Sequence, residues 1–347
     1  MVMIFGSSLC LGLILSYLII KKGGLAEDRP NTRSSHTKVT PRGGGLAFSI
    51  STFIVFSCWH YLFGKPGEWG DLYTLLCIAI GFAILGAAED RSHVSVKLRF
   101  FFEGSLALLL ISAGYRWNSL DFNLFSYIMS TPLSFFMTVV WCVWVANLYN
   151  FMDGINGIAT LVGIVWSLFY FAFASFHGWY ELQVLSLALC GSLLAFLPFN
   201  SPRSKIFMGD TGSLFLGSMF AFIPLYIHSK DGGKLSTFAA TSFMAPFFFD
   251  ATFTVLRRLF LRENIFQPHR YHYFQRLTDL LQSHTKTALI YTSISSLFCF
   301  LIYSIYVGST DPLFPKKAVP IWIALFSLVG FFMVIHWKHL RLLKKKS

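Results

Sequence analysis

Residues 157–197 read GIATLVGIVWSLFYFAFASFHGWYELQVLSLALCGSLLAFL, and this stretch decides the fold class. It contains two apolar runs, 157–176 and 180–197, separated by the short turn His177-Gly178-Trp179. Its only charged side chain is that of Glu181. A helix needs about 20 mostly apolar residues to cross the hydrocarbon core of a membrane. Each run therefore predicts a membrane-spanning helix.

Further runs of this kind follow one another along the chain. They cover 2–20, 43–63, 72–88, 98–114, 131–149, 213–229, 236–255, 287–308 and 319–336. The sequence therefore predicts an all-α polytopic bundle of about eleven transmembrane helices, forming a single integral membrane domain over residues 1–347. No Lys or Arg precedes the first run and no small-residue cleavage site follows it. We interpret it as an uncleaved first span.

The composition supports a lipid environment. Hydrophobic residues make up 55% of the chain, whereas charged residues make up 13%. A soluble globular chain carries roughly 25% charged residues. This deficit indicates that the lipid bilayer surrounds most of the chain. The six cysteines lie singly within apolar runs, so we interpret them as small hydrophobic side chains rather than metal ligands.

The positive charge is distributed unevenly along the chain, whose net charge is +12. Of the 28 Lys and Arg residues, 22 fall in one alternating set of loops, namely 21–42, 89–99, 150–156, 198–212, 256–286 and the tail 337–347. Cytoplasmic loops are enriched in Lys and Arg, so this set is predicted to be cytoplasmic. The N-terminus is then outside and the C-terminus inside. No basic soluble domain is present, so nucleic acid is not an expected partner.

Polar clusters that suit chemistry lie in loops 21–45, 89–99, 147–159, 198–213 and 256–286. The first contains Arg33 and His36, followed by three glycines at 43–45 that let a backbone approach a phosphate closely. Positive-inside charge and close helix packing are the alternative explanation for these residues.

The second cluster contains the adjacent carboxylates Glu89 and Asp90. Two such groups repel each other and need a cation or a shared proton. Magnesium held by carboxylates and substrate phosphates is the commonest resolution. Salt bridges to Arg91 and Lys97 are the alternative.

The third cluster, at 147–159, contains no Lys or Arg. A glycine C-cap explains one of its glycines, but not Asn150, Asp153 and Asn156 together. We interpret this loop as a polar turn that binds a ligand. In the fourth cluster Asp210 directly precedes a predicted helix, which it would cap unless it binds a metal.

The fifth cluster contains His269, Arg270 and His272. Arg binds phosphate through two parallel hydrogen bonds, and His donates to phosphate or relays a proton. Next to lipid headgroups such residues are also common as a surface feature. Two acids, Glu103 and Asp250, lie within predicted spans, where acids usually face the bundle interior. For Asp250, pairing with Arg257 or Arg258 is the alternative to a functional role.

Taken in order, these clusters resemble those of the polyprenyl-phosphate N-acetylhexosamine-1-phosphate transferases. The matching stretches are the first cytoplasmic motif at 33–45, Glu89-Asp90 for Asp-Asp, 150–159 for Asn-x-x-Asp-Gly-x-Asp-Gly-x-Ala, 207–213 for Phe-Met-Gly-Asp-x-Gly-Ser, and 269–272 for the His-rich loop. Glu89 and Asn156 depart from the pattern, which has Asp at both positions. The form His-Arg-x-His-x-x-Gln at 269–275 is closer to the O-antigen-initiating branch than to the peptidoglycan branch.

The resemblance implies transfer of an N-acetylated amino sugar-1-phosphate from a UDP-sugar to undecaprenyl or another polyprenyl phosphate, with release of UMP. The sugar is of the GlcNAc, GalNAc, FucNAc or QuiNAc type. The product initiates O-antigen or another cell-envelope polysaccharide at the bacterial inner membrane. The implied cofactor is Mg²⁺, with Mn²⁺ as an alternative. A homodimer stays open as an oligomeric state.

The resemblance also implies residue roles. The implied catalytic residues are Glu89, Asp90, Asp153, Asp210 and His272. Asp210 is the leading metal ligand, and Asp90 is a second ligand or keeps the lipid phosphate deprotonated. The nucleoside would be held by Asn150, Asp153 and Asn156, and the phosphates by Arg33, His36, His269, Arg270 and His272.

A secondary transporter of an anion or a lipid-linked sugar is the alternative class, since many spans and intramembrane acids are typical of it. Such a transporter places polar residues near the bilayer midplane, in helices broken in paired halves. The polar clusters of this chain lie instead at predicted helix ends on one face. Their position favours an enzyme.

Overall fold

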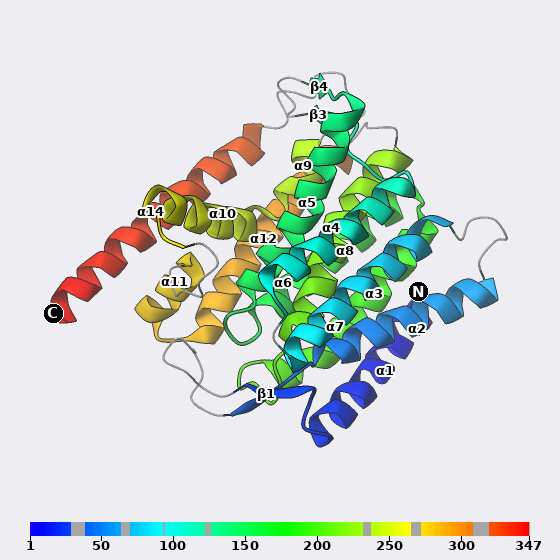
Figure 1. Cartoon of the computed structure of the whole chain (residues 1–347), viewed down its shortest axis with the longest axis horizontal. Helices are drawn as coiled ribbons and strands as arrows, with labels where there is room; N and C mark the ends of the chain where they lie inside the picture. The colour runs from blue at the N-terminus through cyan, green and yellow to red at the C-terminus, as the bar shows by residue number, and fades with distance from the viewer. Residues whose placement is uncertain are drawn as a thin grey trace.

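The computed structural model of the chain describes residues 1–28, 39–63, 70–92, 94–121, 126–231, 237–264, 272–307 and 319–346. These residues form a bundle of helices (Figure 1), which confirms the predicted all-α class. In chain order the helices are α1 (Val2–Lys21), α2 (Gly45–Phe63), α3 (Gly70–Arg91), α4 (Val96–Ser112), α5 (Thr131–Met152), α6 (Ile158–His177), α7 (Tyr180–Asn200), α8 (Gly209–Lys230), α9 (Thr237–Ser242), α10 (Ala245–Phe260), α11 (Tyr273–Leu281), α12 (His284–Val307) and α14 (Val319–Lys346).

Nine helices in the described part of the chain are long and apolar enough to cross a membrane, namely α1, α2, α3, α5, α6, α7, α8, α12 and α14. The other two predicted spans differ from simple spanning helices. Residues 98–114 largely form α4, which has 17 residues, and residues 236–255 are divided between α9 and α10. Pro246 lacks the N–H that would bond to the carbonyl of Ser242, where α9 ends. The proline therefore explains the interruption.

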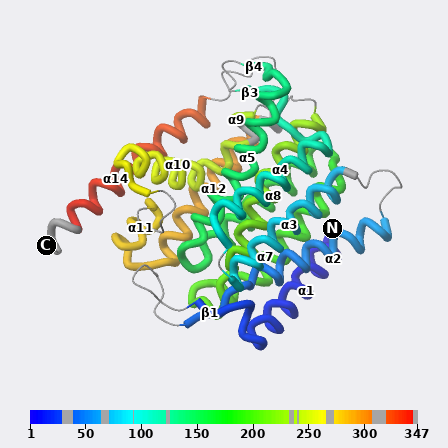
Figure 2. Tube along the Cα trace, viewed as in Figure 1, coloured from blue at the N-terminus to red at the C-terminus, as the bar shows by residue number. Residues whose placement is uncertain are grey.

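Helix α8 is the central helix of the bundle. All its residues from Thr211 to His228 are buried, and it packs against α2, α3, α5, α6 and α9. Small residues allow these close approaches: a Cβ on Gly217 would lie 2.8 Å from the Cα of Ala146 in α5. Around this centre, α1 and α14 lie at opposite edges of the bundle (Figure 2).

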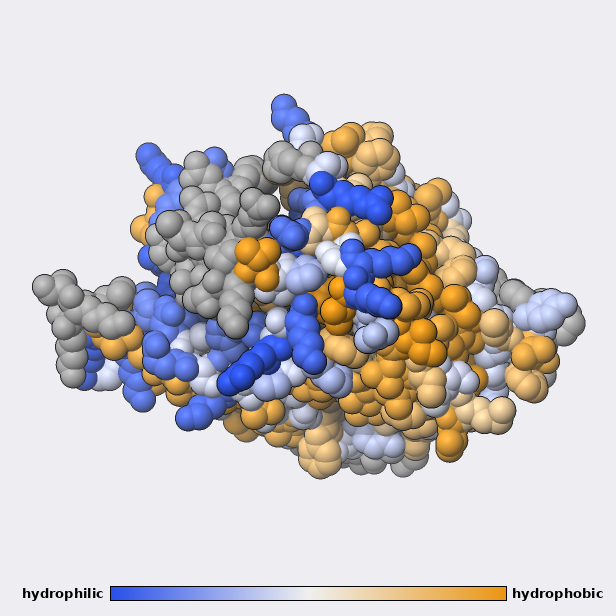
Figure 3. All heavy atoms as spheres, turned by 90° about the horizontal axis from the view of Figure 1, so that it is seen from below, coloured by the Kyte–Doolittle hydropathy of each residue, from blue (hydrophilic) through white to orange (hydrophobic). Residues whose placement is uncertain are grey.

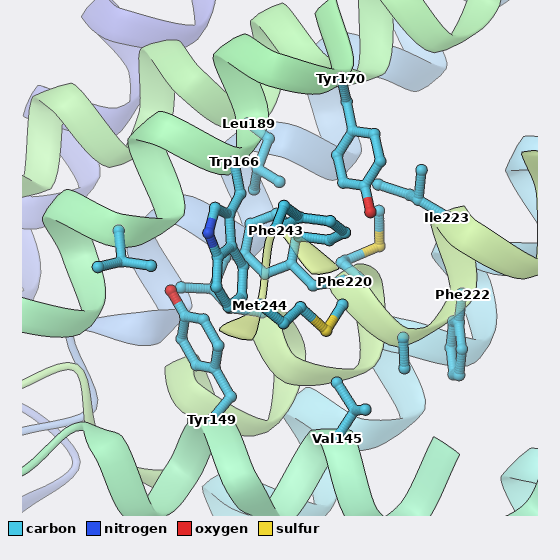
Figure 4. Close-up of a cluster of buried hydrophobic side chains, with 14 of the residues drawn as sticks. Val145, Tyr149, Trp166, Tyr170, Leu189, Phe220, Phe222, Ile223, Phe243 and Met244 are labelled. Atoms are coloured by element: carbon cyan, nitrogen blue, oxygen red, sulfur yellow. The ribbon is translucent and has the colours of Figure 1, made fainter. Parts of the chain in front are cut away.

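An aromatic cluster joins α5, α6 and α8 to the break between α9 and α10 (Figure 4). The Trp166 ring meets Phe220 and Phe243 edge to face, with centroids 4.9 and 5.0 Å apart, a favoured aromatic geometry. The hydroxyl of Tyr149 donates to the carbonyl of Ala159 at 2.6 Å. This cluster fixes the end of α5, where the polar 147–159 segment begins.

Two short antiparallel hairpins, absent from the all-α prediction, lie in the connections. One pairs β1 (Ala26–Asp28) with β2 (Thr40–Arg42), and the other pairs β3 (Ser119–Asp121) with β4 (Ser126–Ile128). β1 and the β3–β4 pair lie at opposite ends of the bundle (Figure 1). Figure 3 views the molecule from the side on which β1 lies in Figure 1. Hydrophilic side chains gather in the middle of this face, with apolar surface beside them.

Candidate active site

The end of α3 meets the start of α8 through Asp90. Its Oδ1 accepts a hydrogen bond from the N–H of Asp210 at 2.9 Å, and its Oδ2 accepts from the N–H and the hydroxyl of Thr211 at 3.0 and 2.6 Å. The first N–H groups of a helix have no partner within that helix, and a carboxylate there also interacts favourably with the helix dipole. Asp90 is therefore a cap for α8, supplied from 120 residues away in the sequence.

Glycines make this junction tight. Gly209 has φ of +72°, and a Cβ at this position would collide with the Asp90 carboxylate. A Cβ on Gly45, at the start of α2, would collide with the backbone of Gly212. Close packing of α2 against α8, the alternative explanation for the glycines at 43–45, therefore explains why residue 45 is glycine.

Asp210 is more accessible than Asp90. Its side chain is 27% exposed, whereas Asp90 is buried. The amide of Asn150, at the end of α5, donates to Asp210 Oδ1 and to the Ser213 hydroxyl, both at 2.8 Å. Three predicted clusters therefore meet at one place, since α3, α5 and α8 contribute Asp90, Asn150 and Asp210.

Arg99 is a site residue that the sequence analysis did not select. Its guanidinium lies 3.0 Å from Glu89, 3.0 Å from Glu103 and 3.8 Å from Asp210. The predicted alternative of pairing Glu89 with Arg91 or Lys97 is wrong, because Glu89 pairs with Arg99. The spacing of four residues between Arg99 and Glu103, which places both on one helix face, was the available signal.

Glu103 is fully buried in α4 and faces the bundle interior, as expected for an intramembrane acid. The amide of Asn147 donates to its Oε2 at 2.6 Å, while the carbonyl oxygen of the same amide accepts from Arg99 at 2.9 Å. Glu103 and Asn147 together hold the guanidinium of Arg99 beside Glu89. This arrangement places one fixed positive charge among the carboxylates.

Asp153 directly follows the last residue of α5. Desolvation and the negative charge of Asp210 raise the pKa of the Asp153 carboxyl well above its usual value, while the positive charge of Arg42 opposes this change. Arg42 lies in β2 and pairs with Asp28 of β1 at 3.1 Å. The hairpin therefore holds a second cation near the acidic group.

The turn after Asp153 is tied to the loop after α7. The side-chain amide of Asn156 donates to the carbonyl of Pro202 at 3.0 Å. Asn200 accepts from the N–H of Gly157 at 3.1 Å and from the Thr160 hydroxyl at 2.9 Å. Asn200 was not predicted from the sequence to have a role. Its hydrogen bonds make it a scaffold residue that fixes the start of α6.

His272 is the N-cap residue of α11. The centroid of its ring lies 6.2 Å from that of Phe151 and 5.6 Å from that of Phe274. A Cβ on Gly154 would lie 2.6 Å from the Phe274 ring, so α11 packs directly on the turn after α5. The other predicted phosphate-binding residues lie outside the described residues: Arg33, His36, His269 and Arg270.

The oxygen-rich donor set fits Mg²⁺. Within the described ranges, no three or more His, Cys, Asp or Glu side chains are grouped as a metal site. Mg²⁺ is usually held by one or two carboxylates together with waters and substrate phosphates, so a larger group is not required. Asp210 offers a partly exposed carboxylate next to the hydroxyl of Ser213, and Mn²⁺ accepts the same ligands.

The fold and this site define a polytopic membrane protein that gathers carboxylates, amides and arginines at one end of its helices. Comparison with known proteins identifies its class. Residues 72–228 match the family described as glycosyl transferase family 4. The chain belongs to this family, whose members among its relatives are polyprenyl-phosphate sugar-1-phosphate transferases, and it is such an enzyme. The resemblance seen in the sequence is confirmed, and the transporter alternative is set aside.

Three relatives illustrate the range of the family. A probable undecaprenyl-phosphate N-acetylglucosaminyl 1-phosphate transferase of Bacillus subtilis is 29% identical over 334 residues, 93% of this chain and 85% of the relative. A decaprenyl-phosphate N-acetylglucosaminephosphotransferase of Mycobacterium tuberculosis is 28% identical, covering 75% and 71%. A phospho-N-acetylmuramoyl-pentapeptide-transferase of Clostridium botulinum is 34% identical over 238 residues, covering 64% and 71%.

Proposed function

We propose that the enzyme transfers an N-acetylhexosamine 1-phosphate from its UDP-sugar to undecaprenyl phosphate. A phosphate oxygen of the lipid attacks the β-phosphorus of the donor. The new P–O bond forms as the bond between the β-phosphorus and the bridging oxygen breaks, and UMP leaves. The observation that carries the proposal is the junction of α3, α5 and α8, where accessible Asp210 lies beside Asn150 and buried Asp90.

The relatives favour a simple N-acetylhexosamine over a pentapeptide-bearing sugar. The Bacillus subtilis relative, whose name specifies N-acetylglucosaminyl 1-phosphate, aligns with 93% of this chain. The pentapeptide-transferase of Clostridium botulinum aligns with 64%. The form His-Arg-x-His-x-x-Gln supports the same choice. UDP-GlcNAc is therefore the first donor to test, before its GalNAc, FucNAc and QuiNAc counterparts.

Two anions must approach each other in this reaction, and Mg²⁺ when bound supplies the positive charge that screens them and polarises the diphosphate. Asp210 would hold the ion. Asp90 would keep Asp210 in place through its bonds to the first turn of α8. Oδ1 of Asp90 accepts one hydrogen bond and has two lone pairs, so Asp90 is also the candidate second ligand through this oxygen. Arg99 would keep the neighbouring Glu89 from repelling the donor.

The polar turn between α5 and α6 would bind the nucleoside through Asn150, Asp153 and Asn156. Arg42, in the β1–β2 hairpin, and His272, at the start of α11, would bind the phosphates. Arg33, His36, His269 and Arg270 stay predicted phosphate ligands. These roles assign the nucleotide to the α5 side of Asp210 and leave the opposite side for the lipid phosphate.

The charge distribution supports a cytoplasmic site in a bacterial inner membrane, with the N-terminus outside and the C-terminus inside. The product would then be the first lipid-linked sugar of a cell-envelope polysaccharide, of which O-antigen is one. A homodimer is compatible with this function but is not needed for it.

The test is release of UMP by the purified full-length protein in detergent. The reaction contains undecaprenyl phosphate, Mg²⁺ and one UDP-amino sugar from a panel. The proposal expects UMP only when lipid and metal are both present, with the best donor identifying the sugar. UMP formed equally without lipid would mean hydrolysis, and no UMP from any N-acetylhexosamine donor would overturn the proposal.

A further inference from the structure

The carboxylate of Asp250, in α10, is fully buried and accepts hydrogen bonds at both oxygens. Its Oδ1 lies 2.9 Å from the N–H of Tyr273 and 3.1 Å from Nδ1 of His272. Its Oδ2 lies 2.8 Å from the N–H of Phe274 and 2.5 Å from the hydroxyl of Tyr291. Three of these four groups belong to the beginning of α11. Asp250 therefore joins α10 to α11 and α12.

The pairing of Asp250 with Arg257 or Arg258, expected as an alternative from the sequence, is not what holds this carboxylate. Arg258 pairs with Glu263 at 3.0 Å and donates to the carbonyl of Asn264. The first N–H groups of α11 instead take the place of a cation, because they lack partners within the helix and lie at its positive end. Asp250 thereby fixes where α11 starts.

The same carboxylate determines the orientation of His272. Nδ1 of His272 lies 3.1 Å from Oδ1 of Asp250, and His272 also exchanges the two hydrogen bonds of a capping box with Gln275. The ring plane is confined further by Phe151 and Phe274. Phe151 directly follows Asn150, whose amide contacts Asp210, so the imidazole packs against the same end of α5 that contributes Asn150 to the proposed site.

We propose that Asp250 is a positioning residue for the transfer reaction, which fixes the place and the orientation of His272 at the start of α11. The inference rests on the proposed function, in which His272 contacts a substrate phosphate. It assigns a role to a buried acid of α10, whereas the carboxylates proposed to act in the site belong to α3 and α8 and to the turn after α5. Asp250 itself would touch neither the donor nor the lipid.

The test measures steady-state UMP release by Asp250→Asn in the full-length protein. Asn has the same shape, but its NH₂ group replaces one acceptor and faces a donor of α11. The proposal expects kcat to fall about 10- to 100-fold, as for residues that orient a reactive His, while KM for the UDP-sugar stays within about twofold. A kcat within about twofold of wild type, or a loss confined to KM, would overturn it.

A double-mutant cycle with His272→Gln separates positioning from general structural support. If Asp250 acts through His272, adding Asp250→Asn to His272→Gln changes kcat by less than about twofold. An equal loss in both backgrounds would overturn the proposal. The matched control is Tyr291→Phe, which removes a donor from the other carboxylate oxygen without touching His272, and for which we expect kcat within about threefold of wild type.

Two further measurements distinguish a variant that fails to fold from a failure of the proposed function. Thermal unfolding in detergent reports whether each variant is folded. If Asp250→Asn is not folded, Asp250→Glu retains the charge and both acceptors, and its effect on kcat must likewise vanish in the His272→Gln background. A His272→Gln variant with wild-type kcat would overturn the inference, whereas UMP release that needs lipid would still support the reaction itself.

Discussion

The guanidinium of Arg99, in α4, lies 3.0 Å from the carboxylate of Glu89, near the end of α3. It also lies 3.0 Å from Glu103 and 3.8 Å from Asp210. A single partly buried cation thus contacts carboxylates that belong to three helices. Removing it would leave negative charges without compensation at the centre of the proposed site.

Arg99→Met should therefore lower both stability and turnover. Loss of one partner from a buried ion pair costs about 3–5 kcal/mol, and Glu103 is fully buried. Adding Glu103→Gln should recover part of the lost Tm. Arg91→Gln, which changes an exposed arginine of the same segment, is the matched control. If Arg99→Met and Arg91→Gln had the same Tm in detergent, the assigned pairing would be wrong.

Asp210→Asn should abolish turnover, because it removes the accessible carboxylate proposed to hold the metal. We expect kcat to fall at least about 100-fold at saturating Mg²⁺. Asp231→Asn is the control, since Asp231 follows the other end of the same helix. Near-wild-type UMP release by Asp210→Asn would reject the assigned role.

Gly209→Ala should disrupt the junction between α3 and α8. Gly209 has φ of +72°, and its Cβ would collide with the carboxylate of Asp90. Gly178→Ala is the control that separates backbone strain from collision. Gly178 has φ of +69°, but no atom lies within 4 Å of a Cβ built there. The strain of positive φ alone costs about 1–2 kcal/mol. We expect Gly209→Ala to lower Tm by more than Gly178→Ala does. Only Gly209→Ala should also lose UMP release. Equal effects would argue against the tight junction.

Asp153 should make stability depend on pH. The pKa of its carboxyl is raised in the folded protein by desolvation and by Asp210, so the folded state binds more protons than the unfolded state. Stability should therefore be fully present below about pH 4, the ordinary Asp value, and fall as pH rises toward the raised pKa. Without Mg²⁺, Asp153→Asn should unfold at a higher Tm than wild type at neutral pH, but not at acidic pH. A Tm difference that does not change with pH would contradict this account.

The same residue should affect donor binding. Asp153→Ala is expected to raise KM for the UDP-sugar, because the turn between α5 and α6 is proposed to hold the nucleoside. Ser204→Ala, in the neighbouring loop after α7, serves as a control for general disturbance of this region. An unchanged KM with normal kcat in Asp153→Ala would remove the nucleoside assignment.

Hydropathy predicted the spans because a bilayer constrains length and polarity strongly. The break between α9 and α10 carried a signal in Pro246, but an apolar run continues through it. The bond between Asp90 and the start of α8 joins residues 120 apart, and no local pattern indicates such a contact. Arg99 was missed because its partners Glu89 and Asp210 lie on other helices. Asp250 was noticed as an acid, but its partners depend on the packing of α11.

The central claim is transfer of the donor's β-phosphorus to the lipid. The direct measurement uses UDP-GlcNAc labelled with ³²P at the β-phosphate, incubated with the purified enzyme, undecaprenyl phosphate and Mg²⁺, followed by extraction with organic solvent. The account predicts that the label enters the lipid fraction in a one-to-one ratio with released UMP, and that Asp210→Asn prevents this. Label that stays in the aqueous phase while UMP is released would contradict it.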